Sequence, residues 1–196
     1  MKAGAGTKAG KEKKAAIMAA AERLFAERGV AATSTRDIAR ELGIGDASLY
    51  RHFPSKEVLV AELFADGYRE YGRLLRAAAD GKRGGRARLS AMVREVCRLA
   101  DEDAARFTFL LLAQHGGLPT VEVGTDSPVD AVRACLAEAL PEADAELAAA
   151  VAIGVVLQAA TFRAYGRIAR PMSELAPTLA DAAWAAACAC VARTPE

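Results

Sequence analysis

The sequence predicts an all-α protein, and three observations point to that class. About a quarter of the 196 residues are alanine, which has the highest helix propensity of any residue. Apolar residues recur at three- and four-residue spacing along most of the chain, which is the period of helices that bury one face. Runs of β-branched residues are few. A chain of this length can bury a sizeable core, and we expect about nine helices.

The first helix is predicted at residues 11–28, because apolar residues recur there at helical spacing. These residues are Ile17, Ala21, Leu24 and Phe25. Gly29 follows as a natural C-terminal cap. Residues 1–10 consist mainly of Gly, Ala and Lys, so we expect a disordered basic tail there.

Residues 35–53 predict two short helices separated by a glycine turn. Ser34, followed three residues later by Asp37, is a plausible N-cap with an acidic first turn. Gly43 supplies the left-handed conformation that the turn requires. The apolar residues that would hold the two helices together are Ile38, Leu42, Ile44 and Leu49. This is the arrangement of a helix-turn-helix, which places its second helix in the DNA major groove; the alternative is an ordinary helical hairpin.

Six further helices are predicted after the helix-turn-helix. The segment 54–57 signals the start of a long helix at 56–79, which the glycines of 81–85 interrupt. Ser127 and Pro128 mark another helix start, whereas Pro177 leaves the start of the last helix uncertain by a turn. The remaining helices are expected at 86–101, 103–115, 128–140, 143–169 and 173–193.

The charges are distributed unevenly along the chain. Residues 1–57 carry a net charge of +4 and the remainder a net charge of −3, for a total of +1. A basic N-terminal third on a faintly acidic body suggests that only this end meets a polyanion. The alternative is a lysine-rich tail that only adds solubility. The tail lysines that would follow the DNA backbone or minor groove are Lys2, Lys8, Lys11, Lys13 and Lys14.

Cysteine usage and hydropathy indicate a cytoplasmic protein. No CxxC pair occurs and the two histidines lie far apart, so no metal site is expected. The four cysteines are expected to be buried thiols in a reducing cytosol, with redox sensing left open; they are Cys97, Cys135, Cys188 and Cys190. No signal peptide is visible, and the most apolar runs, 148–160 and 182–192, are shorter than the ~20 residues that span a bilayer.

Residues 11–63 resemble the DNA-binding domain of the TetR family of transcriptional regulators. The resemblance rests on a long run of residues in the right order and spacing: Phe25 and Gly29, Thr33 to Ala39, Leu42 to Ile44, and Ser48 to Glu57. It implies a DNA-binding domain at 11–55 and a helical ligand-binding and dimerisation domain at 56–196. One departure is Gly45-Asp46-Ala47, where the family commonly has a Ser-Lys-Gly type of start to the recognition helix.

The resemblance also assigns candidate DNA contacts. It implies that Tyr50, His52 and Lys56 contact phosphates and that the segment 46–51 faces base edges, through Asp46, Ala47, Ser48 and Arg51. From their chemistry, Thr35 and Arg36 would add a hydroxyl and a guanidinium at a helix start that already favours anions. Asp46 would repel phosphates or accept a hydrogen bond from a cytosine. The alternatives are a capping role for His52 and a packing role for Tyr50.

For the C-terminal part, the resemblance implies an effector site and a dimer formed through the last two long helices. The candidate pocket residues combine apolar bodies with a few polar tips, although each one alone is more typical of ordinary core. They are Phe107, Leu110, Leu111, Gln114, His115, Gln158, Phe162 and Tyr165. No cluster of charges accompanies them, which mildly favours an apolar or weakly polar effector of unknown identity.

The sequence therefore predicts a homodimeric repressor that binds a palindromic double-stranded DNA operator and is released by a small-molecule effector. An enzyme is not expected, because no Ser/His/Asp or Cys/His arrangement and no phosphate loop is recognisable, and no cofactor or membrane contact is expected either. Another alternative is a partner-binding protein whose helix-turn-helix no longer binds DNA. Asp46 is the single feature that supports this alternative.

Overall fold

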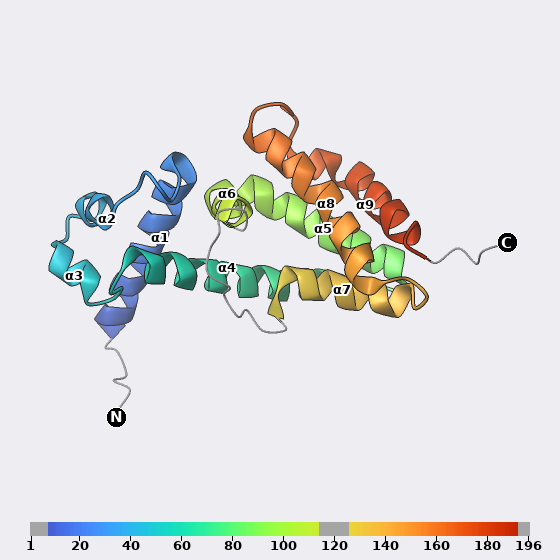
Figure 1. The fold of residues 1–196 in the computed structure, drawn as a ribbon, viewed down its shortest axis with the longest axis horizontal. Helices are drawn as coiled ribbons and strands as arrows, with labels where there is room; N and C mark the ends of the chain where they lie inside the picture. The colour runs from blue at the N-terminus through green and yellow to red at the C-terminus, as the bar shows by residue number, and fades with distance from the viewer. Residues whose placement is uncertain (1–7, 114–125, 192–196) are drawn as a thin grey trace, which may run out of the picture. The chain divides into compact units, whose positions relative to one another are not determined.

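The computed structural model describes residues 8–113 and 126–191. Within these ranges the chain forms nine α-helices and, apart from one isolated bridge between Ala143 and Val191, no extended pairing, so the predicted fold class is confirmed (Figure 1). The helices are α1 (Lys8–Arg28), α2 (Thr35–Glu41), α3 (Asp46–Tyr50), α4 (Lys56–Ala79), α5 (Gly85–Glu102), α6 (Ala104–Ala113), α7 (Pro128–Ala139), α8 (Ala145–Ala164) and α9 (Met172–Cys188).

The helices form two compact units. The first unit runs to residue 66 and includes the C-terminal part of α6 from residue 108; the second contains the rest of α4 and α6 together with α5, α7, α8 and α9. The boundary between the two compact units therefore falls inside α4, after residue 66. The predicted domain boundary lay at the start of this helix, between residues 55 and 56. As a division of functions, the boundary at 55 stays a prediction.

The first unit is built around side chains from α1, α2, α3 and α4. The predicted inward residues of α1 are all buried, and the rings of Phe25 and Phe109 stack with centroids 5.8 Å apart. Thr33 is buried in the loop before α2 and donates its hydroxyl to the Gly29 carbonyl at 2.9 Å. The fully buried side chains that complete this core are Ile38, Leu49, Phe53, Leu59 and Leu63. This core fixes the position of the short helices α2 and α3.

The second unit is a helical bundle in which α9 packs on both α5 and α8, while α7 packs on α5 and α8. Small residues on α8 and α9, among them Ala148, Ala152 and Ala183, are buried at these contacts and let the helix axes approach closely. Two glycines serve the same purpose elsewhere. A Cβ at Gly72 of α4 would meet the backbone of Asp126 and Ser127, and a Cβ at Gly85 of α5 would meet Ala139.

Asp101, near the C-terminus of α5, joins three helices of the second unit. Its carboxylate accepts hydrogen bonds from the backbone N–H of Met172 at 3.0 Å and from the N–H and hydroxyl of Ser173 at 2.8 and 2.7 Å. Arg163 of α8 lies 3.3 Å from the same carboxylate. Pro171, the N-cap residue of α9, provides no side-chain cap, so Asp101 serves as the cap from 71 residues away in sequence.

Several helix ends differ from those predicted. Helix α1 begins at Lys8, so residues 8–10, which were expected in the disordered tail, are helical. Helix α8 ends at Ala164 rather than 169, because Gly166 adopts a φ of 72° and the Arg167 N–H donates to the Phe162 carbonyl at 2.8 Å. Helix α9 begins at Met172 and ends at Cys188 rather than 193. The last two residues of the predicted helix 103–115 lie outside the described residues.

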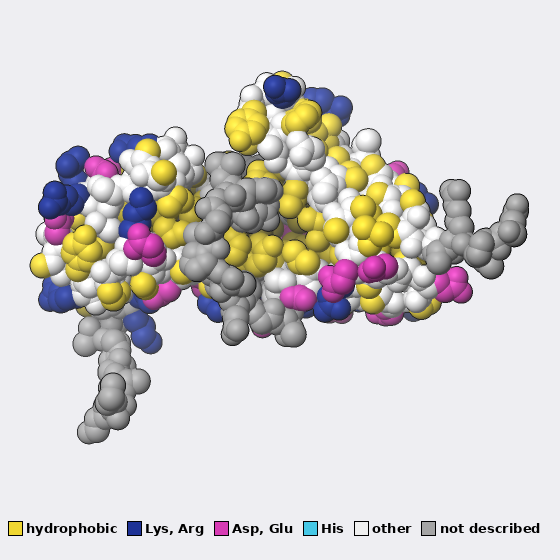
Figure 2. All heavy atoms as spheres, in the orientation of Figure 1, with side chains coloured by type: hydrophobic (Ala, Val, Ile, Leu, Met, Phe, Trp, Pro, Cys, Tyr) yellow, Lys and Arg dark blue, Asp and Glu magenta, His cyan; other side chains and the backbone are white. Residues whose placement is uncertain are grey.

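The expectation that every apolar run is too short to span a bilayer was wrong for α8. This helix has 20 residues and contains an 18-residue stretch with a mean hydropathy of 1.8. It is long and apolar enough to cross a membrane, although a single such helix is weak evidence for a membrane protein. Only 28% of this apolar stretch of α8 is buried within the chain. Hydrophobic side chains accordingly gather on the surface over α8 in Figure 2. Leu147 and Phe162 are the exposed large hydrophobic side chains of this helix.

The cysteines are free thiols. Cys97 and Cys135 are buried as predicted, whereas Cys188 and Cys190 are half-buried. Burial, and then the charge of Asp101, raise the pKa of Cys97 to about 11. This thiol is therefore protonated at neutral pH and poorly reactive.

Candidate nucleic-acid interface

The start of α2 is fixed by Ser34 and Asp37, as the sequence predicted. The Ser34 hydroxyl accepts from the Asp37 N–H at 3.2 Å, and the Ser34 N–H donates to the Asp37 carboxylate at 3.0 Å, which is a complete capping box. Hydrogen bonds from the Ser34 hydroxyl and then from its N–H hold the pKa of Asp37 below its usual range. The carboxylate therefore stays charged at the positive end of α2, where a negative charge stabilises the helix.

Gly43 forms the turn between α2 and α3 with a φ of 62°, as predicted from its position. The Gly43 N–H donates to the Arg40 carbonyl at 3.1 Å and the Ile44 N–H to the Ala39 carbonyl at 3.0 Å. These bonds close the last turn of α2 in the left-handed geometry that glycine adopts without strain.

Helix α3, the candidate recognition helix, has five residues, Asp46–Tyr50, and is shorter than the helix to Phe53 that the sequence indicated. Leu49 and Phe53 are fully buried and anchor this segment in the first unit. His52 lies beyond the helix, in the turn that follows it, where its N–H donates to the Leu49 carbonyl at 2.9 Å. Its backbone thus closes the end of α3, while its side chain is half-buried.

Tyr50 and Thr35 are brought together across the helix-turn-helix. The Tyr50 ring is 47% exposed, and its hydroxyl lies 3.0 Å from the Thr35 hydroxyl. One of the two hydroxyls donates to the other, which leaves the second proton free to reach a phosphate. The packing role that the sequence left open for Tyr50 does not account for so exposed a ring.

Arg36 and Asp46 form an ion pair between the starts of α2 and α3, with 3.4 Å between Arg36 Nε and Asp46 Oδ2. The side chains are 80% and 47% exposed, so the pair lies on the surface. Asp46 therefore offsets the positive charge of Arg36 within the candidate interface. The sequence marked Asp46 as a departure but did not show that Arg36 would be its partner.

Replacing Asp46 with asparagine is expected to strengthen binding to any DNA sequence by roughly threefold to tenfold at low salt. The substitution removes one negative charge and frees Arg36 to meet a phosphate. The measurement is fluorescence anisotropy of a labelled duplex at several salt concentrations, in which the salt slope should steepen by about one unit. A variant that binds DNA more weakly than the parent would instead make Asp46 a direct base contact, and this loss should then depend on the DNA sequence.

The other candidate DNA contacts lie at exposed or half-exposed positions. Ser48 accepts a hydrogen bond from the Arg51 guanidinium at 3.3 Å, so these two side chains lie together beside α3. Ala47 is exposed in the first turn of α3. Lys56 is the first residue of α4, where the Ser55 hydroxyl accepts from the Val58 N–H at 3.3 Å and caps the helix.

Lys14, which was grouped with the tail lysines, is instead part of the fold. Its ammonium lies 2.5 Å from the Glu62 carboxylate and 5.1 Å from the centroid of the Phe53 ring. An ammonium held by a carboxylate and an aromatic face is poorly placed to follow a DNA backbone. The prediction that tail lysines follow DNA therefore rests on Lys2, Lys8, Lys11 and Lys13.

The sequence of this interface is similar to that of known proteins. Residues 17–63 match the model of the bacterial regulatory proteins of the tetR family. This segment of the chain is therefore similar to the DNA-binding part of TetR-family regulators. A segment of 74 residues is 43% identical to the transcriptional repressor KstR2 of Rhodococcus jostii and spans 36% of this chain and 34% of that repressor. The chain thus matches about a third of the length of this relative.

Two solved structures extend the likeness to the whole chain at the level of the fold. A tetR-family transcription regulator from Shewanella sp. PV-4 has a TM-score of 0.72 and 24% identity, over 92% of this chain and 99% of that one. The regulator FadR of Bacillus subtilis, in complex with stearoyl-CoA, has a TM-score of 0.77 and 17% identity, over 86% and 96% of the two chains. Both the relative and the two structures are named as regulators rather than enzymes, in agreement with the sequence prediction.

The residues predicted to bind an effector fall into separate groups. Phe107, Leu110 and Leu111 are buried on α6, and the Phe107 ring stacks on Tyr71 with 6.4 Å between centroids. Gln158, Phe162 and Tyr165 are exposed, on α8 or just after it. Gln114 and His115 lie outside the described residues. An effector site made of these residues stays a prediction; two cavities in the described part of the second unit are lined by none of them.

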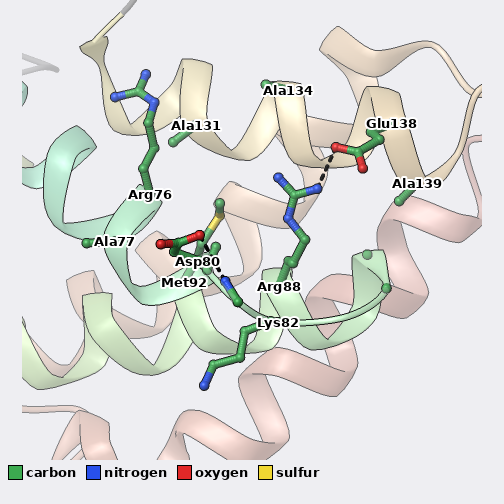
Figure 3. Close-up of a pocket in the computed structure, with 14 residues that line it drawn as sticks. Arg76, Ala77, Asp80, Lys82, Arg88, Met92, Ala131, Ala134, Glu138 and Ala139 are labelled. Atoms are coloured by element: carbon green, nitrogen blue, oxygen red, sulfur yellow. Dashed lines mark hydrogen bonds and ion pairs between the residues drawn. The ribbon is translucent and has the colours of Figure 1, made fainter.

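Those two cavities adjoin the turn between α4 and α5, which the sequence analysis had treated only as a helix break. The first has a volume of about 800 Å³ and lies between the end of α4, the start of α5 and α7. Figure 3 shows Arg88 of α5 reaching toward Glu138 of α7, whereas Lys82 points away from both. The second has a volume of about 820 Å³ and shares Lys82, Gly84, Gly85 and Ala139 with the first. The signal that could have indicated these cavities is the density of basic residues between 82 and 94.

Proposed function

We propose that this protein is a transcriptional repressor of the cytoplasm that binds a palindromic DNA operator as a homodimer. The observation that carries the proposal is the helix-turn-helix, whose sequence matches the TetR family and whose exposed side chains include Arg36, Tyr50 and Arg51. Phosphate contacts would position the domain, and α3 would present Asp46, Ala47, Ser48 and Arg51 to base edges. A five-residue helix gives each subunit few base contacts, so two subunits are needed for a specific site.

We infer that repression is relieved by a small molecule that binds the helical second unit. FadR of Bacillus subtilis, which shares the fold, is described in complex with stearoyl-CoA, so acyl-CoA thioesters are the first effectors to test. The effector acts by binding more tightly to a state in which the two recognition helices no longer match successive major grooves. A coupling of about 1–3 kcal/mol between effector and operator is typical of such regulators.

The proposal is tested by selecting bound fragments from a randomised DNA pool at ~150 mM salt, where nonspecific binding is largely screened. We expect a palindrome whose half-sites lie about one helical turn apart, and the recovered duplex then serves as the probe for effector release. Failure to enrich any sequence with folded, dimeric protein would contradict operator binding.

Replacing Tyr50 with alanine distinguishes a repressor from a partner-binding protein that no longer grips DNA. We expect at least about a tenfold loss of operator affinity. The substitution removes a charge-assisted hydrogen bond from Tyr50 to a phosphate, and it also removes the hydrogen bond between the Tyr50 and Thr35 hydroxyls. Tyr50→Phe keeps the ring and removes only the hydroxyl, so it should account for most of the loss. Unchanged affinity in both variants, measured by anisotropy on the selected duplex, would show that Tyr50 is not part of the interface.

A further inference from the structure

The second of the two cavities at the α4–α5 turn is a groove with an unusual set of charges. Eleven described residues line it, and none of them is acidic. Four are cations, three are glycine or serine, and the others are alanines and Trp184. The cations are Lys82, Arg83, Arg86 and Arg94. The volume of about 820 Å³ lies within the range of pockets that hold small-molecule ligands.

Few of these cations are neutralised within the described part of the chain. Arg86 forms an ion pair with Asp181 at 2.9 Å. Arg94 donates a hydrogen bond to the Ser90 hydroxyl at 2.7 Å, but this hydroxyl carries no charge and does not neutralise it. Lys82 and Arg83 form no ion pair with any described residue. The groove therefore keeps a net positive charge, which raises the local concentration of anions.

The position of these cations is unfavourable for the protein alone. Lys82 and Arg83 precede α5, Arg86 lies in its first turn, and this turn contains no acidic residue. Cations at the positive end of a helix dipole destabilise it. The N-cap residue, Gly84, has a φ of 83° and makes no side-chain hydrogen bond to the helix. A bound anion would reverse both features, since it would neutralise the cations and complement the helix end.

The groove also offers an aromatic face beside the cations. Trp184 of α9 is the only tryptophan in the chain and is half-buried in the groove wall. Gly85 lies against it: a Cβ at this position would stand 3.4 Å from Cη2 of the indole and would collide with Ala139. The absence of a side chain at Gly85 thus keeps the space between the indole and the basic segment open. Indole rings stack well on planar heterocycles.

We propose that this groove binds a phosphorylated ligand of the nucleotide class, with its phosphates on Lys82, Arg83, Arg86 and Arg94 and its planar base against Trp184. Guanidinium groups match phosphate oxygens in a bidentate geometry, and three of the four cations are arginines. The site is distinct from the helix-turn-helix, and its existence does not depend on DNA binding.

Trp184 gives a direct test, because the fluorescence of a single tryptophan reports on this groove alone. The protein is titrated with ADP, with adenosine, with pyrophosphate and with sodium chloride at matched ionic strength, and the affinities are checked by calorimetry. We expect ADP to give a saturable change and to bind at least about tenfold more tightly than adenosine or pyrophosphate. A double variant, Lys82→Ala with Arg83→Ala, should weaken ADP binding at least about tenfold.

The matched control is Arg69→Ala with Arg167→Ala, which removes two charges from exposed positions outside the groove and should leave ADP binding unchanged. Thermal unfolding without ligand checks the fold, and the Lys82/Arg83 variant should be at least as stable as the parent because it removes cations from the start of α5. The proposal is overturned if sodium chloride reproduces the ADP signal, if the Lys82/Arg83 variant binds ADP like the parent, or if pyrophosphate binds as tightly as ADP.

Discussion

Replacing Asp101 with alanine is expected to lower the free energy of unfolding by roughly 2–4 kcal/mol, the largest effect we expect from a single polar side chain of this protein. The carboxylate is only 18% exposed and accepts three hydrogen bonds from the start of α9. Its removal leaves the N–H groups of Met172 and Ser173 without their cap and Arg163 without its ion-pair partner. Chemical unfolding at a fixed protomer concentration measures the loss.

Two matched variants separate the cap from the charge. Asp101→Asn keeps an acceptor oxygen but not the charge, so it should cost about half as much as alanine. Asp181→Ala removes an exposed carboxylate of α9 that pairs with Arg86, and it should cost less than about 1 kcal/mol, as surface ion pairs do. Equal losses in Asp101→Ala and Asp181→Ala would show that Asp101 does not hold α9.

The same carboxylate predicts a dependence on acid. Desolvation alone would raise the pKa of Asp101, but the hydrogen bonds from Ser173 and Met172 and the charge of Arg163 outweigh it and lower the pKa. A carboxyl with a lowered folded-state pKa contributes its stability fully above the unfolded value of about 3.9 and loses it as pH falls through the folded value. The stability difference between the parent and Asp101→Ala should therefore be constant near neutral pH and shrink below about pH 4.

Local signals account for what the sequence predicted correctly. The capping box of Ser34 and Asp37, the left-handed Gly43 and the Ser127 cap of α7 each involve residues a few positions apart, so their geometry follows from the residue types. The end of α8 was missed because apolar residues continue past Ala164, and the competing signal was the single Gly166.

Contacts between distant segments could not be predicted in this way. Asp101 lies 71 residues before Met172, and Lys14 lies far from Glu62 in sequence, so no spacing rule connects them. The candidate effector residues were chosen as apolar bodies with polar tips, but this pattern does not say which face of a helix the bundle covers. The structure leaves Gln158 and Phe162 uncovered on α8 and buries Leu110 on α6.

The uncovered residues of α8 form one continuous stripe. They recur three or four positions apart, which places them on a single face of the helix. They are Leu147, Ala150, Gly154, Gln158 and Phe162, and all are exposed in the single chain. The large residues lie toward the ends and the small ones near the middle, which suits close crossing with the same helix of a second copy. We therefore propose that Gln158 and Phe162 lie in the dimer interface, while their role in effector binding stays a prediction.

Gly154→Arg is expected to abolish both the dimer and specific operator binding while leaving each subunit folded. A Cβ at Gly154 meets no other atom within 4 Å, so the larger side chain causes no clash inside the chain. Helix propensity should even increase by about 0.5–1 kcal/mol, because glycine is a poor residue for a helix interior. At the centre of a two-fold interface, however, two guanidinium groups would meet without partners. Sedimentation should show a monomer, and affinity for the palindrome should fall at least about a hundredfold, since the half-sites would no longer be bound together.

The control for this experiment is Ala137→Arg, which places the same side chain at an exposed position of α7, outside the stripe. It should remain dimeric and bind the operator like the parent. If Gly154→Arg also remains dimeric, the stripe on α8 is not the subunit interface. If it becomes monomeric yet binds the palindrome as tightly as before, the dimer is not what supplies operator affinity. The two readouts therefore test separately the interface and the need for two recognition helices, the two parts of the proposed function that the helix-turn-helix alone does not establish.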